Sequence, residues 1–433
     1  AICTSSRIRL ASAAGAMPDY VERSGLKVDP LLADFIEGEA LPGTPVAADR
    51  LKPARARNIA ELRDAARQRL PRVVFDYVEG GAEDGVTLRA NREALESIRF
   101  APRTLVDVSR RSQQVSLFGR TYDCPFAIAP LGASGLCWRD ADVALARAAR
   151  AANVPFTLST HSFVPVERVT REAGGAPWFQ LYMPKDRAAA GAIVQRAFDA
   201  GCETLVLTTD VPVGGNREHD ERSGFGMPLR VGARTVLDAL RHPRWLAQVY
   251  FRSLRGRDLP LWGLRRDQAD WSDLAWLRAR WPRKLLVKGI LTVQDARLAR
   301  EHGADGIVVS NHGGRQLDGA PATIEVLPRI AAALGGETAI LVDGGFRRGA
   351  DVVKALALGA DMVLVGRPAL YGAAAGGEAG VRRALHILRS EVDRVLALLG
   401  CPSIGDLGPQ HLLKMAPRGS PREGRDRILL KVK

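Results

Sequence analysis

The 433 residues, of which 46% are hydrophobic and 25% charged, suit one large soluble domain with extensions and exceed a single small domain. The five cysteines are odd in number, scattered and without a CxxC pair, which argues against a disulfide framework or a zinc site and for a reducing compartment. The formal net charge of +14 keeps nucleic acid, an anionic membrane and anionic ligands open as partners, whereas no apolar run is long enough to cross a bilayer.

Residues 1–57 form a predicted N-terminal extension, because prolines and glycines interrupt them and "LKPARARN" has the composition of a linker. The opening "AICTSSRIRLASAAGAM" is basic and lacks acids, which is typical of a targeting peptide, but a frayed terminus is the simpler interpretation. Within the extension, "GLKVDPLLADFIEGEALPGTPV" resembles the start of malate synthase. The stretch carries none of that enzyme's catalytic parts, so we assign it no function.

From residue 126 the chain alternates between short apolar strands and amphipathic helices. The predicted strands are "FAIAPL", "FTLST", "WFQLYM", "TLVLTTD", "LLVKGI", "GIVVS", "AILVDGG" and "MVLVGRP". Eight such units within roughly 250 residues predict an α/β fold of the (β/α)8 TIM-barrel type, with parallel strands covered by helices. A doubly wound sheet is the competing architecture, but no GxGxxG motif follows the first strand. We expect a helix over residues 377–400 to close the ring.

A long insertion follows the fourth predicted strand, because that strand ends near Asp210 and the fifth begins near Leu285. Its basic part spans residues 225–270. Residues 225–266 contain nine arginines against two acids, together with these apolar or aromatic residues: Trp245, Leu246, Val249, Tyr250, Phe251, Leu254, Leu261 and Trp262. The segment either contacts an anionic membrane surface or forms a solvated lid over the active site, and the sequence favours neither. Nucleic-acid binding is disfavoured, since no motif for it accompanies the charge.

Polar side chains gather where the predicted strands end. The residues concerned are Gln180, Tyr182, Thr208, Asp210, Lys288, His312, Arg315, Asp343 and Arg367. Because the carboxyl ends of barrel strands meet at one rim, which carries the catalytic groups of such enzymes, we expect these side chains to share one site. The segments "VDGGFRRG" and "VGRP" after strands seven and eight combine glycines with Arg347 and Arg367, which predicts a phosphate site there.

The stretch "SNHGGRQLD" at residues 310–318 resembles the active-site signature of the FMN-dependent 2-hydroxy-acid dehydrogenases, the family that includes glycolate oxidase, L-lactate dehydrogenase and (S)-mandelate dehydrogenase. The resemblance extends over "LPRVVFDYVEGGAED", "FQLYMPKDR", "LVKGI" and "VDGGFRRGADVVKALALGADMVLVGRP". The mandelate-oxidising members are the most similar, judging by "LVDVSRRS" and "GFRRG". The resemblance implies a flavin-binding domain over residues 58–412, followed by a basic tail at 413–433.

The resemblance also implies catalytic roles. His312 would be the base that removes a proton from the 2-hydroxy acid, and Asp210 would stabilise the resulting imidazolium. Arg315 and Arg217 would bind the substrate carboxylate, which a guanidinium matches with two parallel hydrogen bonds. Two tyrosines, Tyr77 and Tyr182, would hydrogen-bond the substrate oxygens.

The same resemblance places FMN. Lys288 would lie against the pyrimidine side of the flavin and stabilise negative charge on the reduced ring. The flavin would contact Pro130, Leu131, Gly132, Ser159, Gln180, Thr208, Lys288 and Ser310. Its phosphate would contact Asp343, Gly344, Gly345, Arg347, Gly366 and Arg367. Three positions depart from the family's usual residues: Leu131 replaces a threonine, Phe75 a tyrosine, and His161 the tryptophan that borders the substrate in glycolate oxidase-like members.

We therefore expect an enzyme that oxidises an (S)-2-hydroxy acid, mandelate-like or lactate-like, to the 2-oxo acid. Electrons would pass to FMN and then to a quinone or another acceptor. An oxidase that produces hydrogen peroxide and a non-enzymatic flavin-binding protein are the alternatives. No metal is expected, and the family precedent implies a homotetramer. The expected location is the cytoplasm, with peripheral contact to the inner face of the cell membrane through residues 225–266.

Overall fold

The computed structural model describes residues 53–225, 233–254 and 268–413. Its centre is a sheet of eight parallel strands in the order β4-β11-β10-β9-β8-β7-β6-β5. A parallel bridge between Ile128 and Phe156 joins the first strand to the segment that leads into the second, so the sheet closes on itself. The strands are β4 (Phe126–Ile128), β5 (Thr157–Ser159), β6 (Trp178–Tyr182), β7 (Thr204–Thr208), β8 (Lys284–Ile290), β9 (Gly306–Val309), β10 (Ala339–Val342) and β11 (Met362–Val365). The predicted (β/α)8 barrel is confirmed.

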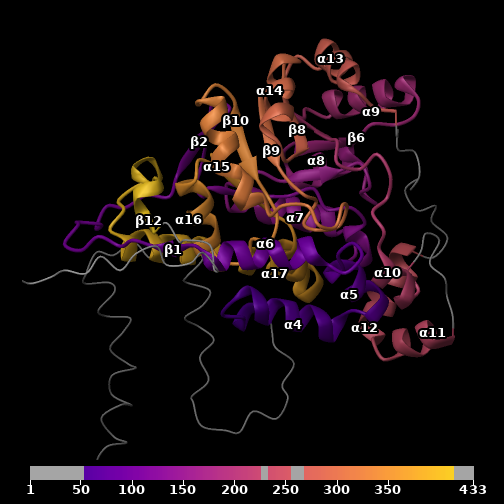
Figure 1. Ribbon diagram of the computed structural model, residues 1–433. Coiled ribbons are helices and arrows are strands. Elements are labelled where there is room, and N and C mark those ends of the chain that lie inside the picture. The colour runs from indigo at the N-terminus through magenta and orange to yellow at the C-terminus, as the bar shows by residue number, and fades with distance from the viewer. Residues whose placement is uncertain (1–52, 226–232, 255–267, 414–433) are drawn as a thin grey trace, which may run out of the picture. The chain divides into compact units, whose positions relative to one another are not determined.

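Along the chain, a helix follows every barrel strand, and Figure 1 labels these helices. The helices are α7 (Ala141–Ala151), α8 (Val166–Ala173), α9 (Arg187–Asp199), α13 (Trp271–Arg280), α14 (Val293–Glu301), α15 (Thr323–Leu334), α16 (Gly349–Ala357) and α17 (Arg367–Leu399). Several begin at a capping side chain, for example α9 at Asp186 and α14 at Thr292. Helix α17 starts ten residues before the predicted 377–400, and it is kinked at Gly376 and Gly377. At Gly377, where φ is +59°, a Cβ would meet the Trp138 indole at 2.6 Å.

Two apolar cores stabilise the barrel. One lies between the outer faces of the strands and the helices, and the other fills the barrel interior. The interior core contains Leu117, Tyr122, Ala127, Ala129, Trp178, Val206, Leu286, Val308, Leu341, Met362 and Leu364. The hairpin of β2 (Val115–Leu117) and β3 (Arg120–Tyr122) supplies Leu117 and Tyr122 and packs near Trp178, where β6 begins. The interior is therefore packed at the strands' amino ends, which leaves the opposite rim for a site.

Three helices precede the barrel: α4 (Ile59–Arg69), α5 (Arg72–Glu79) and α6 (Val86–Ser97). Asn58 caps α4, which packs along α17 (Figure 1). The short turn η1 (Pro53–Arg55) leads into Ala56, which is buried and whose carbonyl oxygen accepts a hydrogen bond from Arg383. Beyond the barrel, η4 (Ile404–Asp406) and η5 (Pro409–His411) lead to β12 (Leu412–Leu413), which pairs with β1 (Arg99–Phe100). The predicted extension up to residue 52 and the tail from residue 414 lie outside the described residues.

The insertion after β7 contains α10 (Glu218–Ser223), α11 (Ala233–Leu240), α12 (Pro243–Trp245) and the π-helix η3 (Leu246–Leu254). The rest of the basic segment, residues 226–232 and 255–267, lies outside the described residues. Trp245 is buried and donates to the Leu136 carbonyl oxygen over 2.8 Å, and the Asp238 carboxylate accepts from the Arg72 backbone N–H over 2.6 Å. These contacts attach the insertion to η2 (Ser134–Leu136) and to α5. In the described part of the chain, no helix has the length and apolar character needed to cross a membrane.

Replacing Leu286 with alanine should lower the free energy of unfolding by about 2–5 kcal/mol, because its buried side chain fills the barrel interior and the cavity would not collapse. Urea denaturation measures the change. Leu398→Ala is the matched control, since Leu398 on α17 is 71% exposed and its truncation should cost less than about 0.5 kcal/mol. Equal losses in the two variants would contradict the packed interior.

Candidate active site

A cleft opens at the carboxyl ends of the barrel strands and encloses about 1050 Å³ of space between atoms, part of it open to solvent. Its lining comes from loops that follow the barrel strands and from α5. Sixteen of the predicted site residues line it: Tyr77, Pro130, Leu131, Gly132, Tyr182, Thr208, Arg217, Lys288, His312, Arg315, Asp343, Gly344, Gly345, Arg347, Gly366 and Arg367. The structure therefore brings these predicted residues together on one cleft, and their roles stay predictions.

The imidazole of His312 is placed by a tight turn after β9. His312 has a positive φ of 58°, which is uncommon for a residue with a side chain, and Gly313 and Gly314 continue the left-handed turn. At Gly314 a Cβ would lie 2.6 Å from the Leu88 backbone nitrogen, so only glycine fits. The His312 N–H donates to the Ser310 hydroxyl over 3.1 Å. The turn directs the side chain into the cleft as soon as the strand ends.

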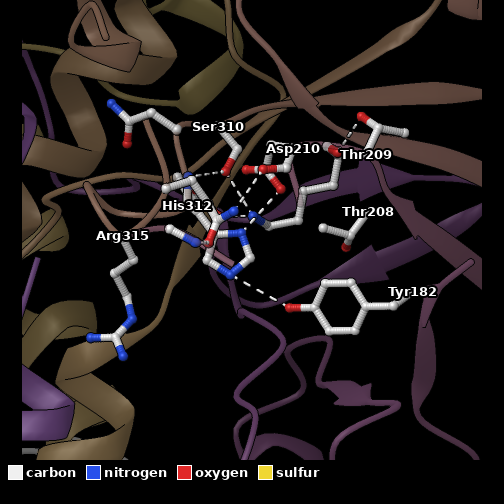
Figure 2. A network of polar contacts seen from close by, with 12 residues as sticks. Tyr182, Thr208, Thr209, Asp210, Ser310, His312 and Arg315 are labelled. Atoms are coloured by element: carbon white, nitrogen blue, oxygen red, sulfur yellow. Dashed lines mark hydrogen bonds and ion pairs between the residues drawn. The ribbon is translucent and has the colours of Figure 1, made fainter. Parts of the chain in front are cut away.

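His312 lies between a carboxylate and a phenol (Figure 2). Its Nδ1 is 3.0 Å from Asp210 Oδ1, and its Nε2 is 3.5 Å from the Tyr182 hydroxyl. Because Nδ1 donates to the carboxylate, the neutral ring keeps the lone pair of Nε2 available to accept a proton. Burial lowers the pKa of His312 and outweighs the opposing effect of Asp210, so the ring is neutral at pH 7.

Asp210 is suited to stabilise the protonated ring. Burial alone would raise the pKa of this carboxyl, but His312 and Lys288 outweigh burial and hold the pKa below its ordinary value. Its second oxygen, Oδ2, is buried and has no hydrogen-bond partner among the described residues. The negative charge of Asp210 therefore acts on the Lys288 ammonium and, once the ring of His312 takes up a proton, on the imidazolium.

Arg315 supplies an anion-binding group on the same turn. Its Nη1 donates to the carbonyl oxygens of Tyr77 and Gly80 at the end of α5, both over 2.7 Å. Its buried Nη2 has no hydrogen-bond partner in the described part of the chain and lies 3.9 Å from Asp220. Burial, together with nearby Arg217, lowers the pKa of Arg315 to about 9, which reflects an excess of buried positive charge. An anion beside Nη2 would accept a hydrogen bond from it and would balance the excess of buried positive charge.

Arg217 and Tyr77 complete this side of the cleft. Arg217 makes two long contacts of 3.4 Å, one to the Arg315 carbonyl oxygen and one to the Gln316 amide oxygen. The Tyr77 hydroxyl donates to the Gly132 carbonyl oxygen over 3.3 Å, and its ring stacks on Phe225 with centroids 4.2 Å apart. These two predicted substrate-binding residues therefore reach the cleft from different elements: Arg217 from the segment after β7, and Tyr77 from α5.

Lys288 forms the charged floor of the cleft. The side chain is 4% exposed, and its Nζ lies 2.7 Å from the Ser310 hydroxyl and 3.0 Å from Asp343 Oδ2. Burial opposes its charge, but Asp343 and Asp210 outweigh burial and raise the pKa of Lys288. The ammonium is therefore charged throughout the physiological pH range.

The predicted phosphate loops meet at one end of the cleft. Gly344 and Gly345 after β10 have φ of +104° and +84°, a backbone conformation that can turn N–H groups toward an anion. Helix α17 begins immediately after Gly366 with no side-chain cap, which leaves the N–H groups of Arg367 and Ala369 for a ligand, whereas Pro368 has none. Arg347 donates to the Tyr371 hydroxyl over 2.7 Å.

Arg367 has partners of its own within the protein. Its guanidinium donates to the carbonyl oxygens of Val78, Gly80 and Gly313 over 2.9, 2.9 and 3.1 Å. It nevertheless lines the cleft together with the glycine loop. Arg367 therefore adds positive charge to the predicted phosphate site while it fixes the end of α5.

Four predicted residues lie behind the cleft surface. Gln180 is fully buried, accepts from the Ser159 hydroxyl over 3.0 Å and donates to the Thr208 hydroxyl over 3.0 Å. Ser310 and Asp210 contact the lysine and the histidine that do line the cleft. These residues support the surface and orient the groups that a ligand would touch.

Two of the three departures from the family's usual residues lie on the cleft. His161 is buried, lines the cleft and stacks on Tyr182 with ring centroids 4.6 Å apart, and Leu131 lines the cleft as well. Phe75 is not among the lining residues; it is buried under the guanidinium of Arg63. The change at residue 75 therefore concerns packing.

Several residues of the site were not predicted from the sequence. Apolar side chains of Val78, Phe346 and Leu370 line the cleft, and Asp220 of α10 is the carboxylate nearest to Arg315 Nη2. The lining cations are Arg217, Lys288, Arg315, Arg347 and Arg367, and Asp343 is the one acid among the lining residues. The cleft thus joins a base to two anion-binding regions.

Comparisons with known proteins agree with this geometry. Residues 66–414 match the family described as FMN-dependent dehydrogenase. The chain is 45% identical over 369 residues to an (S)-mandelate dehydrogenase of Pseudomonas putida, covering 82% of this chain and 93% of the relative. It is 44% identical to a putative L-lactate dehydrogenase of Mycobacterium tuberculosis, covering 84% of this chain and 92% of the relative.

Solved structures give the same result. A structure described as the monotopic membrane protein (S)-mandelate dehydrogenase superposes with a TM-score of 0.80 at 43% identity, covering 83% of this chain and 99% of the other. A mandelate oxidase structure gives a TM-score of 0.72 at 41% identity, covering 83% and 98%. The chain therefore belongs to the FMN-dependent dehydrogenase family.

Proposed function

We propose that this protein oxidises an (S)-2-hydroxy acid, mandelate-like or lactate-like, to the corresponding 2-oxo acid with FMN as its cofactor. The observation that carries the proposal is the neutral His312, held by Asp210, on the same short turn as Arg315, whose Nη2 has no hydrogen-bond partner among the described residues. A base and a carboxylate-binding group are the two functions that a hydroxy acid requires from the protein. The family membership supports the same chemistry.

The residues of the cleft fit FMN. At Gly366 a Cβ would meet nothing closer than Leu131 at 3.7 Å, so the missing side chain leaves room in the cleft itself. Lys288 is a buried cation at the floor, and the glycines after β10 together with Arg347 and Arg367 suit a phosphate. When bound, FMN would supply the two-electron acceptor that no side chain provides.

The chain's own residues would then divide the work. Arg315 and Arg217 would hold the carboxylate of the substrate. Tyr182 would hydrogen-bond the oxygen of the substrate's 2-hydroxyl group near His312 Nε2. His312 Nε2 would accept a proton from the substrate, and Asp210 would stabilise the positive ring. Burial of these groups strengthens each of these interactions relative to water.

We propose a quinone or another acceptor, in preference to oxygen, as the final destination of the electrons. The relatives named dehydrogenases support this choice. An oxidase is the second candidate, because a relative from Nostoc is named L-lactate oxidase and mandelate oxidase structures superpose well. Stoichiometric hydrogen peroxide during turnover in air would identify the oxidase. A homotetramer remains part of the proposal on family precedent.

We also propose that the insertion rests on an anionic membrane surface from the cytoplasmic side. Trp245 and Val249 pack inward, whereas Leu237, Leu240 and Phe251 are 61%, 61% and 57% exposed. Arg241 and Arg244 are exposed on the same segment. Exposed apolar side chains beside arginines suit lipid headgroups better than a solvated lid, and one structural relative is described as a monotopic membrane protein.

Replacing His312 with glutamine should leave FMN bound and slow flavin bleaching by (S)-mandelate or (S)-lactate about 10²-fold to 10⁴-fold, the usual cost of a lost base. Anaerobic stopped-flow absorbance measures this rate. Because burial lowers the pKa of His312, the unaltered protein should lose rate only when the pH falls below about 6.5. Bleaching at the native rate in the variant would remove His312 from the mechanism.

Replacing Arg315 with methionine should reduce kcat/KM about 10-fold to 100-fold for free hydroxy acids, since a charged hydrogen bond to the carboxylate is lost. The methyl esters of the same acids provide the comparison within one variant. The unaltered protein should prefer the acid strongly, and the variant should lose that preference. Equal effects on acid and ester would contradict carboxylate binding by Arg315.

Replacing Leu237, Leu240 and Phe251 together with serine should weaken sedimentation with vesicles that contain anionic lipid, while flavin bleaching is unchanged. The three exposed side chains contribute apolar area to the membrane contact. Leu398→Ser is the control, because Leu398 is exposed on α17 outside this segment. Undiminished sedimentation of the triple variant would place the contact elsewhere.

A further inference from the structure

Two buried asparagines form a reciprocal amide pair next to the cleft. Asn311 follows β9, and Asn91 lies on α6, far earlier in the chain. Asn91 Nδ2 donates to Asn311 Oδ1 over 2.9 Å, and Asn311 Nδ2 donates to Asn91 Oδ1 over 2.8 Å. Asn91 is 1% exposed and Asn311 4% exposed, so water does not replace these bonds. The pair joins α6 to the residue that immediately precedes His312.

The Asn311 side chain uses its full hydrogen-bonding capacity. Besides the two bonds within the pair, its Oδ1 accepts from the Gly314 N–H over 3.2 Å and its Nδ2 donates to the Pro321 carbonyl oxygen over 3.0 Å. Gly314 ends the left-handed turn that His312 begins. The amide therefore spans the turn and holds both of its ends, which fixes the backbone from which the imidazole projects.

The same pair contacts the predicted phosphate loop. A Cβ at Gly345 would lie 2.9 Å from the Asn91 Cβ, and a Cβ at Gly344 would lie 3.3 Å from Asn311 Oδ1. Asn91 Oδ1 also accepts from the Thr323 N–H over 3.3 Å, and the Thr323 hydroxyl donates to the Asp343 carbonyl oxygen over 2.5 Å. The glycine loop after β10 is thus packed directly on the amides.

We propose that Asn91 and Asn311 are positioning residues that hold the His312 turn and the Gly344–Gly345 loop in fixed relation to each other. Neither side chain lines the cleft, so they act through the groups that do. The base and the cofactor must meet the substrate with an accuracy of about 1 Å, since a displacement of that size costs about 100-fold in rate. This inference rests on the proposed function.

Asn91→Leu tests the role, because leucine preserves the volume and removes both reciprocal bonds. Loaded with FMN, the variant should bleach with (S)-mandelate or (S)-lactate about 10-fold to 100-fold more slowly at saturating substrate. The KM for the acid should change much less, since Arg315 is held by α5 and not by the pair. FMN affinity, measured by flavin fluorescence, should fall because the glycine loop loses its support. Hydrogen exchange across residues 310–316 should become faster.

Asn91→Asp gives a signature that general destabilisation would not produce. An ionised carboxylate would place an oxygen against Asn311 Oδ1, whereas the protonated acid can donate to it. Burial raises the pKa of such a carboxyl. The bleaching rate of Asn91→Asp relative to the unaltered protein should therefore rise as the pH is lowered from about 8 to about 6. A ratio that does not depend on pH would overturn the proposal.

Asn58→Ala is the matched control for lost stability. Asn58 caps α4 through a hydrogen bond from the Glu61 N–H, and it is not among the residues that line the cleft. It should lower the melting temperature and leave bleaching and FMN affinity unchanged. Native bleaching and native exchange of residues 310–316 in Asn91→Leu would overturn the positioning role. If the unaltered protein failed to bleach with any 2-hydroxy acid, the proposed function would fail, and the exchange measurement would still decide the role of the pair.

Discussion

The site depends on one arrangement of charge: two buried guanidinium groups from the barrel donate to the carbonyl groups that end α5. Arg315 donates hydrogen bonds to the carbonyl oxygens of Tyr77 and Gly80, and Arg367 donates to those of Val78 and Gly80. The carboxyl end of a helix carries partial negative charge and unsatisfied acceptors, so it can hold two cations that would otherwise repel each other. This arrangement keeps positive charge buried at the cleft without a matching number of carboxylates.

Different elements supply different parts of the chemistry. The strand ends of the barrel provide the ionisable groups, because parallel strands bring them to one rim with little freedom to move. The loops after β10 and β11 provide glycines and the start of α17 for an anion. The helices that precede the barrel provide no proton donor or acceptor for the proposed proton transfer. They provide carbonyl groups, the Tyr77 ring and Asn91, which hydrogen-bonds to Asn311 and packs against Gly345.

The sequence predicted the barrel well, because its apolar strands and amphipathic helices repeat regularly. It also predicted that His312, Asp210 and Lys288 share one rim, and the structure places Lys288 within β8, Asp210 two residues after β7 and His312 three residues after β9. The roles of these three residues stay predictions. It did not predict Asp220 beside Arg315, or the pairing of Asn91 with Asn311. Those contacts join segments more than a hundred residues apart or lie in an insertion without periodicity, and no local pattern encodes such a pairing. The predicted start of the last helix, residue 377, lies ten residues after the true start of α17 at Arg367. Two adjacent glycines resemble a helix boundary, but α17 is only kinked at Gly376 and Gly377 and continues past them.

The dependence of the cleft on α5 has a consequence for the order in which the molecule assembles. The carbonyl groups of residues 77–80 leave the ribosome early, yet their guanidinium partners follow 235 to 289 residues later. During synthesis the carbonyl groups at the end of α5 therefore bind water instead of these guanidinium groups until almost the whole barrel exists. Contacts of such long range form slowly. We infer that the catalytic end is the last region of the protein to mature, and that a nascent barrel is at its most vulnerable there.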